Sequence, residues 1–134
     1  MNDSRSSANQ SHFVLAVDDD PSDLELIQRV LLRNGYAVRT AQSGKEAISL
    51  MEQILPAVLI LDVAMPGMSG YDLCSFLKRD RRMKDIPVVF LTGQDSPKNF
   101  KTGHEVGATF YVPKSSGLEG VVRAVRTLWA GAKG

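Results

Sequence analysis

Polar residues of the kinds that support catalysis or ligand binding follow four apolar runs in this sequence. Three aspartates at 18–20 follow one run, Asp62 follows a second, and Thr92 and Lys114 follow two more. Carboxylates that are held close together repel one another, so such a cluster either keeps a proton or binds a cation. Mg²⁺ typically takes one or two carboxylates together with phosphate oxygens. This sparse set of oxygen ligands therefore predicts Mg²⁺ as the cofactor.

Phosphoryl transfer to a carboxylate is a reaction that these residue types can support. A carboxylate can attack phosphorus and form an acyl phosphate when a metal, a cation and a hydroxyl donor offset the charge of the transferring group. Asp62 would supply the carboxylate, Lys114 the cation and Thr92 the hydroxyl. Such a reaction depends mainly on positioning and electrostatics, so the elements that carry these residues must bring them together.

Five short apolar or alternating runs predict the strands of a sheet. They are Phe13 to Val17, Tyr36 to Ala41, Ala57 to Leu61, Val88 to Leu91, and Thr109 to Val112. The segments between them have helical patterns, and alternating strands and helices indicate a parallel sheet with helices on both faces. All strand carboxyl ends then lie at one edge, where open α/β sheets bind their ligands.

The segments between the runs also have the start and stop signals of helices. Asp20 before Pro21 predicts an N-cap, and because one cap needs one side chain, Asp18 and Asp19 are expected to serve another purpose. Gly35 is expected to end this first helix. Three later helices are predicted to begin with capping boxes, formed by Ser43 with Glu46, Ser69 with Asp72, and Ser116 with Glu119.

The last two predicted helices differ in the strength of their patterns. A helix expected to start near Ser96 and Pro97 is weak, because Gly103 and Gly107 interrupt it. The final helix has a continuous apolar stripe, which consists of Leu118, Val121, Val122, Val125, Leu128 and Trp129. This last helix is expected to pack on the sheet.

Length and composition indicate one small domain. The chain has 134 residues and a formal net charge of +1. One domain is expected over residues 12–134, while the polar stretch 1–11 is expected to be a disordered tail and not a signal peptide. The basic stretch 78–84 also contains Asp80, so direct nucleic-acid binding is not expected. No apolar run is long enough to cross a membrane, and the protein is expected to be soluble and cytoplasmic.

Three motifs give the sequence a resemblance to a known family. They are Val17 to Pro21, Leu61 to Gly70, and Ile86 to Gly93, and each is placed at a strand end. Their order and spacing together resemble the receiver domain of two-component response regulators, over about residues 13–130. The resemblance implies a chemotaxis-regulator-like α/β fold, which is a flavodoxin-like (βα)5 doubly wound parallel sheet with strand order 2-1-3-4-5.

The resemblance also implies a role for each acidic residue of the site. Asp62 would be the phosphoacceptor, and Asp19 and Asp62 would bind Mg²⁺ directly. Asp18 would help to bind the metal through water. The backbone carbonyl of Ala64 would complete the protein ligands.

The resemblance also implies which residues bind the phosphoryl group and which respond to phosphorylation. Thr92 and Lys114 would bind the phosphoryl oxygens, and Thr92 with Tyr111 would form the switch that responds to phosphorylation. Ala64 and Gln94 occupy the two positions that tune dephosphorylation in this family. Because alanine cannot orient an attacking water and the Gln94 amide can, the phosphoryl group is expected to have a moderate to long lifetime.

The sequence departs from the family pattern directly after Lys114. The family usually has a proline there, joined by a cis peptide bond, whereas this chain has Ser115. A cis bond before serine would cost about 3 to 4 kcal/mol, so this peptide is expected to be either trans or strained. Pro113 lacks an N–H group and is best accommodated if its strand lies at a sheet edge.

The implied function is that of a signalling domain and not of an enzyme in the usual sense. A histidine kinase or a histidine phosphotransfer protein would donate the phosphoryl group. The signal would reach a downstream protein target through the face that is formed by the helix near Ser96, the strand at 109–112 and the final helix. The sequence leaves open whether the chain forms a homodimer, whether it is complete, and which kinase and target it serves.

Two alternative functions remain open from the sequence. A haloacid-dehalogenase-like phosphatase would use Asp18 as its nucleophile, but the chain lacks an acidic pair after Lys114 and leaves Asp62 without a role. A degenerate receiver would act only as a docking module. Such chains have usually lost the acceptor, the lysine or the acidic pair, and all three are present here.

Overall fold

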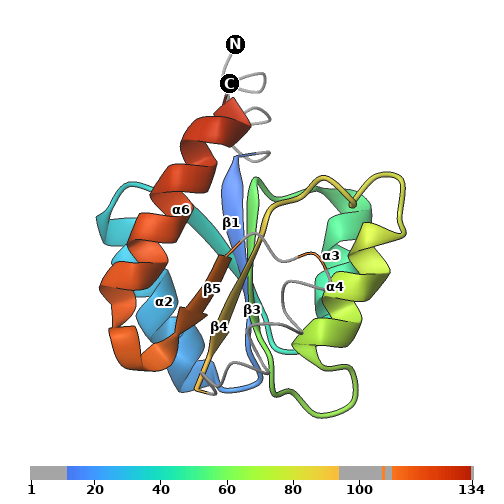
Figure 1. Ribbon diagram of the computed structural model, residues 1–134, viewed down its shortest axis with the longest axis horizontal. Coiled ribbons are helices and arrows are strands. Elements are labelled where there is room, and N and C mark those ends of the chain that lie inside the picture. The colour runs from blue at the N-terminus through green and yellow to red at the C-terminus, as the bar shows by residue number, and fades with distance from the viewer. Residues whose placement is uncertain (1–11, 94–106, 108–109, 134) are drawn as a thin grey trace.

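A computed structural model describes residues 12–93, 107 and 110–133 of the chain. Its core is one five-stranded parallel sheet in the order β2-β1-β3-β4-β5 (Figure 1). The strands are β1 (Phe13–Val17), β2 (Ala37–Ala41), β3 (Val58–Asp62), β4 (Val88–Thr92) and β5 (Phe110–Pro113). The helices are α2 (Pro21–Arg33), α3 (Gly44–Gln53), α4 (Gly70–Lys78) and α6 (Leu118–Lys133), and a 3₁₀ turn, η1, spans Lys114–Ser116. The predicted fold class and strand order are confirmed.

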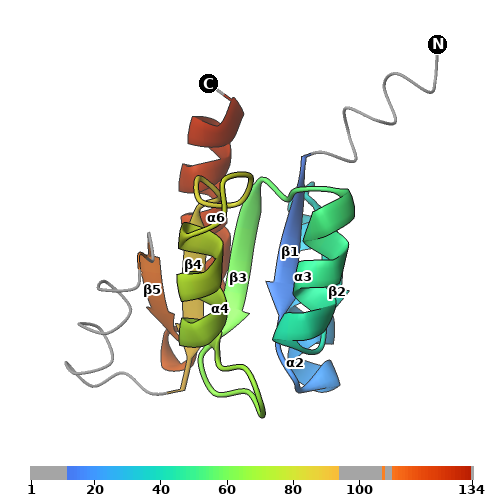
Figure 2. The same cartoon turned by 90° about the vertical axis from the view of Figure 1, so that its right-hand side faces the viewer.

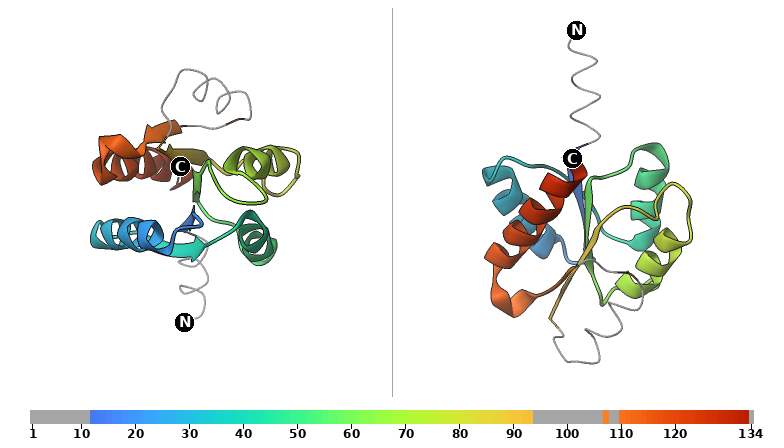
Figure 3. Two further views of the ribbon diagram at one scale, coloured as in Figure 1. Left: turned by 90° about the horizontal axis from the view of Figure 1, so that it is seen from below. Right: turned by 45° about the horizontal axis from the view of Figure 1, so that its top comes forward.

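The two faces of the sheet are both buried, as the sequence predicted. Alternate residues of β1, β3 and β4 pack with α3 and α4 on one face and with α2 and α6 on the other. Figures 1 and 3 show these two helical layers on opposite sides of the sheet. Leu59 and Ile60 of β3 illustrate the alternation, since Leu59 belongs to the first core and Ile60 to the second, and each has at most 1% of its surface exposed. This two-sided packing holds the central strands rigidly.

The first helix begins and ends as predicted. The Asp20 carboxylate accepts hydrogen bonds from the backbone N–H groups of Ser22 and Asp23 at 2.8 and 3.4 Å, and Pro21 occupies the first helical position. After the helix, Gly35 adopts a φ of 90°, which is the left-handed conformation that glycine accepts without strain. Asp20 is therefore a helix cap.

The three predicted capping boxes have different outcomes. Ser69 and Asp72 form a complete box, in which each side chain accepts a bond from the other's backbone N–H at 3.1 Å. Ser43 accepts from Glu46 N, but the Glu46 carboxylate accepts from Gln42 N, one residue before the cap.

The third capping box, at Ser116, is wrong. Ser116 is the last residue of η1 and its hydroxyl donates to the Pro113 carbonyl at 2.7 Å, while α6 begins only at Leu118. Gly117, with a φ of 80°, separates the two elements. The Ser116 hydroxyl thus bonds within the 3₁₀ turn, and it does not cap the helix as the sequence predicted.

Strand β5 lies at the edge of the sheet, which accommodates Pro113 as its last residue. The apolar stripe of α6 packs as predicted, with Val121 and Val125 fully buried against the sheet. The predicted tail at 1–11 and the predicted helix near Ser96 lie outside the described residues. Within the described part of the chain, no helix combines the length and the apolar composition that crossing a membrane requires.

Candidate functional site

The carboxyl ends of the strands bring the predicted site residues to one edge of the sheet, which is the lower edge in Figure 2. Asp18 directly follows β1, Asp62 and Thr92 are the last residues of β3 and β4, and Lys114 directly follows β5. Asp18, Asp62 and Thr92 are 2%, 7% and 1% exposed, although they are polar. Because their strands are packed on both faces, these side chains have little freedom to move apart.

Three carboxylates form a cluster with the composition of a metal site. Asp18, Asp19 and Asp62 each offer one carboxylate oxygen, and these oxygens lie within 4.8 Å of one another. Asp18 also accepts a hydrogen bond at 3.0 Å from Asp20 N, which fixes its orientation. A few hard oxygen ligands, with one carboxylate exposed to solvent, fit Mg²⁺, because this ion keeps several of its waters when it binds. Ala64 lies two residues beyond Asp62 and is exposed on the loop that follows β3.

Lys114 provides the positive charge of the site. Its ammonium nitrogen lies 2.9 Å from Asp23 Oδ2, 3.4 Å from Asp18 Oδ2 and 3.5 Å from Asp62 Oδ1. The described residues contain no cis peptide bond, so Lys114 and Ser115 are joined in trans. The departure from the family's proline is thus accommodated without a cis peptide, and η1 directs Lys114 into the acidic cluster.

Asp23 is a site residue that the sequence pattern did not indicate. It lies in the first turn of α2, and there the sequence suggested no role beyond the start of the helix. A topological signal could have found it, because α2 starts four residues after β1 ends and its first turn must lie at the same sheet edge. Sequence spacing alone does not show that a side chain of this turn reaches Lys114.

Burial and charge shift the proton affinities of the site. The pKa of Asp62 is raised from 3.8 to about 6: burial is the main cause, the nearby charge of Asp18 adds to the rise, and Lys114 opposes it. Burial likewise raises the pKa of Asp18, against its hydrogen bond from Asp20 N and the charge of Lys114. Burial lowers the pKa of Lys114, but its hydrogen bond to Asp23 and the charges of Asp62 and Asp18 outweigh this and raise it. The lysine therefore stays protonated.

The loop after Asp62 is tightly packed around two glycines. Gly70 N donates a hydrogen bond to Val63 O at 3.0 Å, and a Cβ atom at Gly70 would collide with the Asp62 carbonyl oxygen. A Cβ atom at Gly44 would meet the side chain of Met68, with Sδ at 2.6 Å. These close approaches fix the backbone that carries Asp62.

The remaining predicted residues are placed as follows. Thr92 pairs in register with Pro113, so it lies beside the strand that leads to Lys114. Tyr111 is half-buried, and its ring lies 6.4 Å from that of Phe90 in an edge-to-face arrangement. Gln94 lies outside the described residues. The roles of these residues in switching and dephosphorylation stay predictions.

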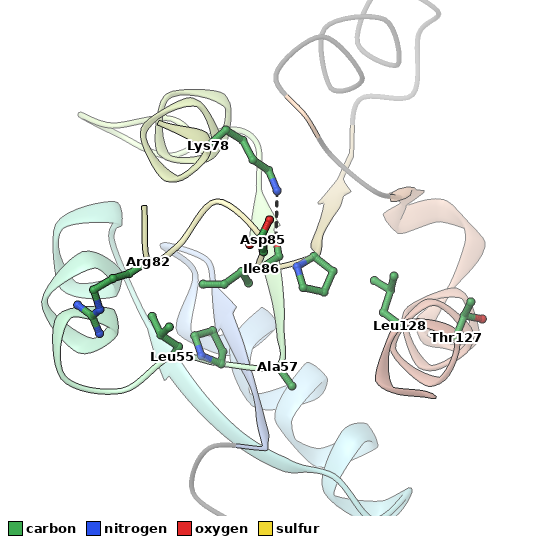
Figure 4. A pocket seen from close by; sticks show the side chains of 10 residues that line it. Leu55, Ala57, Lys78, Arg82, Asp85, Ile86, Thr127 and Leu128 are labelled. Atoms are coloured by element: carbon green, nitrogen blue, oxygen red, sulfur yellow. Dashed lines mark hydrogen bonds between the residues drawn. The ribbon is translucent and has the colours of Figure 1, made fainter. Parts of the chain in front are cut away.

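A cavity of about 510 Å³ lies away from this edge and contributes nothing to the site (Figure 4). Its lining includes Ala57 and Pro87, which precede β3 and β4 and so lie at the opposite end of the sheet. Lys78, at the wall of this cavity, donates hydrogen bonds to Lys84 O at 3.1 Å and to Ile86 O at 3.0 Å. The lysine thus anchors the loop that precedes β4.

Comparison with known proteins agrees with this arrangement. The response regulator receiver domain matches residues 14–126 of the chain. The response regulator MprA of Mycolicibacterium vanbaalenii is 37% identical over 115 residues, which are 86% of this chain and 49% of MprA. The chain therefore spans about half the length of the curated MprA relatives that it matches.

Solved structures show the same fold. The chemotaxis protein CheY4 of Vibrio cholerae is 31% identical, with a TM-score of 0.81 over 89% of this chain and 98% of that chain. The response regulator TrrA of Thermotoga maritima, solved in complex with Mg²⁺ and BeF, is 29% identical, with a TM-score of 0.77 over 87% of this chain and 98% of that chain. From the match over residues 14–126 and these likenesses, we conclude that the chain belongs to the response regulator receiver domain family, the signalling domains of two-component phosphorelays.

Proposed function

We propose that this receiver domain accepts a phosphoryl group on Asp62 in a reaction that depends on Mg²⁺. The observation that carries the proposal is the convergence of Asp18, Asp19, Asp62 and Lys114 at one buried strand edge. Packed strands hold two of the three carboxylates, so their mutual repulsion cannot be relieved by moving apart. A divalent cation would offset the charge of these carboxylates and, together with Lys114, the negative charge of an incoming phosphoryl group.

The residues of the chain would each contribute one part of the reaction. An Asp62 carboxylate oxygen forms a bond to phosphorus, while the bond from phosphorus to the donor breaks and its electron pair stays with the donor. With a pKa of about 6, Asp62 is mostly ionised at neutral pH and can act as the nucleophile. Lys114 and Thr92 would bind the transferred oxygens by an ammonium and a hydroxyl hydrogen bond.

The metal would be held by Asp18, Asp19 and Asp62 together with the Ala64 carbonyl. When bound, Mg²⁺ offsets the negative charge of these carboxylates and of the phosphoryl oxygens. The donor set supports this assignment, as does the complex of the related TrrA with Mg²⁺ and BeF.

A histidine kinase or a histidine phosphotransfer protein is the proposed phosphoryl donor, as two-component signalling implies. The proposed output is a protein target that binds a face including β5 and α6. Thr92 and Tyr111 are proposed to couple this face to the phosphate, because Tyr111 lies on β5 and Thr92 pairs with the end of that strand. Ala64 and Gln94 are proposed to give the phosphoryl group a moderate to long lifetime.

A direct test is incubation with acetyl phosphate and Mg²⁺, followed by intact-mass analysis. Wild type should gain one phosphoryl group that hydroxylamine removes, as an acyl phosphate requires, and EDTA should prevent the gain. Asp62→Asn should gain none. Asp85→Asn is the matched control, because Asp85 is exposed and lies in the loop before β4, at the opposite end of the sheet. Labelling of Asp62→Asn to the wild-type level would refute the proposal.

The same variants, assayed also for hydrolysis of phosphate esters, address the two alternatives. A phosphatase that uses Asp18 would turn over phosphate esters, and Asp62→Asn would retain that turnover. The hydrogen bond that Asp18 accepts from Asp20 N favours a supporting role over that of a nucleophile. A docking-only receiver would gain no phosphoryl group in any variant.

A further inference from the structure

The shortest contact of Lys114 lies outside the three-carboxylate cluster. Asp23 Oδ2 is 2.9 Å from the ammonium nitrogen, whereas the oxygens of Asp18 and Asp62 are 3.4 and 3.5 Å away. Only the Asp23 contact has the length usual for a hydrogen bond between an ammonium and a carboxylate. The lysine is therefore held mainly by a residue of helix α2 and only secondarily by the acceptor itself.

Asp23 also differs from the other two carboxylates in its surroundings. Its side chain is 35% exposed, whereas the side chains of Asp18 and Asp62 are 3% and 8% exposed. It is not one of the carboxylates whose oxygens converge as a candidate metal site. A cation bound among Asp18, Asp19 and Asp62 would offset their charge but would leave the charge of Asp23 directed at Lys114.

We propose that Asp23 competes with the incoming phosphoryl group for Lys114 and thereby limits how readily Asp62 is phosphorylated. The inference rests on the proposed function, because it concerns the same lysine and the same acceptor. In the unphosphorylated state Asp23 holds the ammonium group. When a phosphoryl group reaches Asp62, the phosphoryl oxygens must replace Asp23 as the partner of the Lys114 ammonium group. The negative charge of Asp23 also repels these oxygens as they approach.

The structure leaves space for the Asp23 side chain to move away from Lys114. A cavity of about 220 Å³ lies beside the ion pair and is lined by Asp23, Lys114, Leu26 and Ile27, among others. Because Asp23 lies in the first turn of α2 and is partly exposed, its side chain can turn toward solvent without disturbing the buried core. The exchange of partners then needs no movement of the strands.

The first experiment tests the ion pair without metal or phosphate. Trace acetylation with acetic anhydride at fixed pH in EDTA, read by peptide mass spectrometry, measures how strongly Lys114 is protected. Asp23→Asn should increase the labelling of Lys114 several-fold. Glu25→Gln is the matched control, because it removes the same charge from an exposed site of α2 that pairs with Arg29, and it should leave the labelling unchanged. Equal labelling of Asp23→Asn and wild type would overturn the proposal.

The second experiment measures the competition itself. With saturating Mg²⁺ and acetyl phosphate at low ionic strength, Asp23→Asn should be phosphorylated about two- to fivefold faster than wild type, the range that a partly exposed ion pair supports. The gain should shrink at high salt, Asp23→Glu should restore the wild-type rate, and Glu25→Gln should match wild type. An unchanged or slower rate for Asp23→Asn would overturn the proposal and leave phosphorylation of Asp62 intact. A failure of every variant, wild type included, to gain phosphate would instead overturn the proposed function, and this inference with it.

Discussion

Ionisation of Asp62 should cost the protein stability, because its carboxylate is buried beside Asp18. The pKa of Asp62 rises from 3.8 to about 6 on folding, with burial as the main cause. A carboxyl group whose pKa is raised by folding binds its proton more tightly in the folded state. Its ionisation therefore destabilises the fold above about pH 6, and this penalty disappears as the pH falls toward 3.8.

The substitution Asp62→Asn removes this penalty while it keeps the shape of the side chain. The rise from 3.8 to about 6, at about 1.4 kcal/mol for each tenfold change, corresponds to about 3 kcal/mol at pH 8. The attraction of Lys114 is already contained in this net value, and Lys114 retains Asp23 and Asp18 as partners in the variant. At pH 5 the expected difference is about half as large.

Urea unfolding in EDTA, followed by circular dichroism at pH 8 and pH 5, measures both differences. Asp62→Asn should have the higher free energy of unfolding at pH 8, and Asp85→Asn should resemble wild type. Added Mg²⁺ should narrow the gap, because binding to the folded wild type stabilises it and the variant lacks one ligand. An Asp62→Asn variant that is less stable than wild type at pH 8, or a gap that does not change with pH, would refute this reasoning.

Three further substitutions are expected to destabilise the fold in the same unfolding assay, and a fourth, Gly93→Ala, is a control. Gly70→Ala should destabilise the fold by about 1 to 3 kcal/mol, because its Cβ atom would collide with the Asp62 carbonyl oxygen, and it should also slow phosphorylation. Gly93→Ala should be tolerated, because a Cβ atom there would have open space around it. Asp20→Ala should cost about 1 kcal/mol through the lost helix cap. Lys78→Met should cost about 1 to 3 kcal/mol through two lost bonds to carbonyls of the loop before β4. Wild-type stability in any of these three would contradict the role given to that residue.

The sequence predicted the sheet well because its strands are buried and regular. Strand β1 was predicted with its observed bounds, and the other four agree within one residue at each end. The main shift is that Asp62 and Thr92 belong to their strands instead of following them. Hydrophobic patterning could not show this, because the polar residue that ends an apolar run can still pair with the next strand.

The sequence predicted most residues of the candidate site but not the contact between Asp23 and Lys114. Parallel topology alone brings Asp18, Asp62 and Lys114 to one edge, so their meeting followed from the order of the strands. The pairing of Asp23 with Lys114 depends on how α2 and η1 are oriented at that edge, and spacing along the chain does not determine this. The Ser116 cap failed for a similar reason, because local backbone geometry at Gly117 decided which turn the hydroxyl joined.

The cation of the site reaches it from far along the chain. Lys114 bonds to Asp23 and Asp18, which lie 91 and 96 positions earlier in the sequence. Contacts of such separation close long loops, and the chain loses entropy when it closes them. A folding intermediate with β1, β3 and β4 in place would already contain all three clustered carboxylates but no lysine beside them. The proposed phosphoryl site would then be complete only when β5 has docked, because β5 leads directly to Lys114.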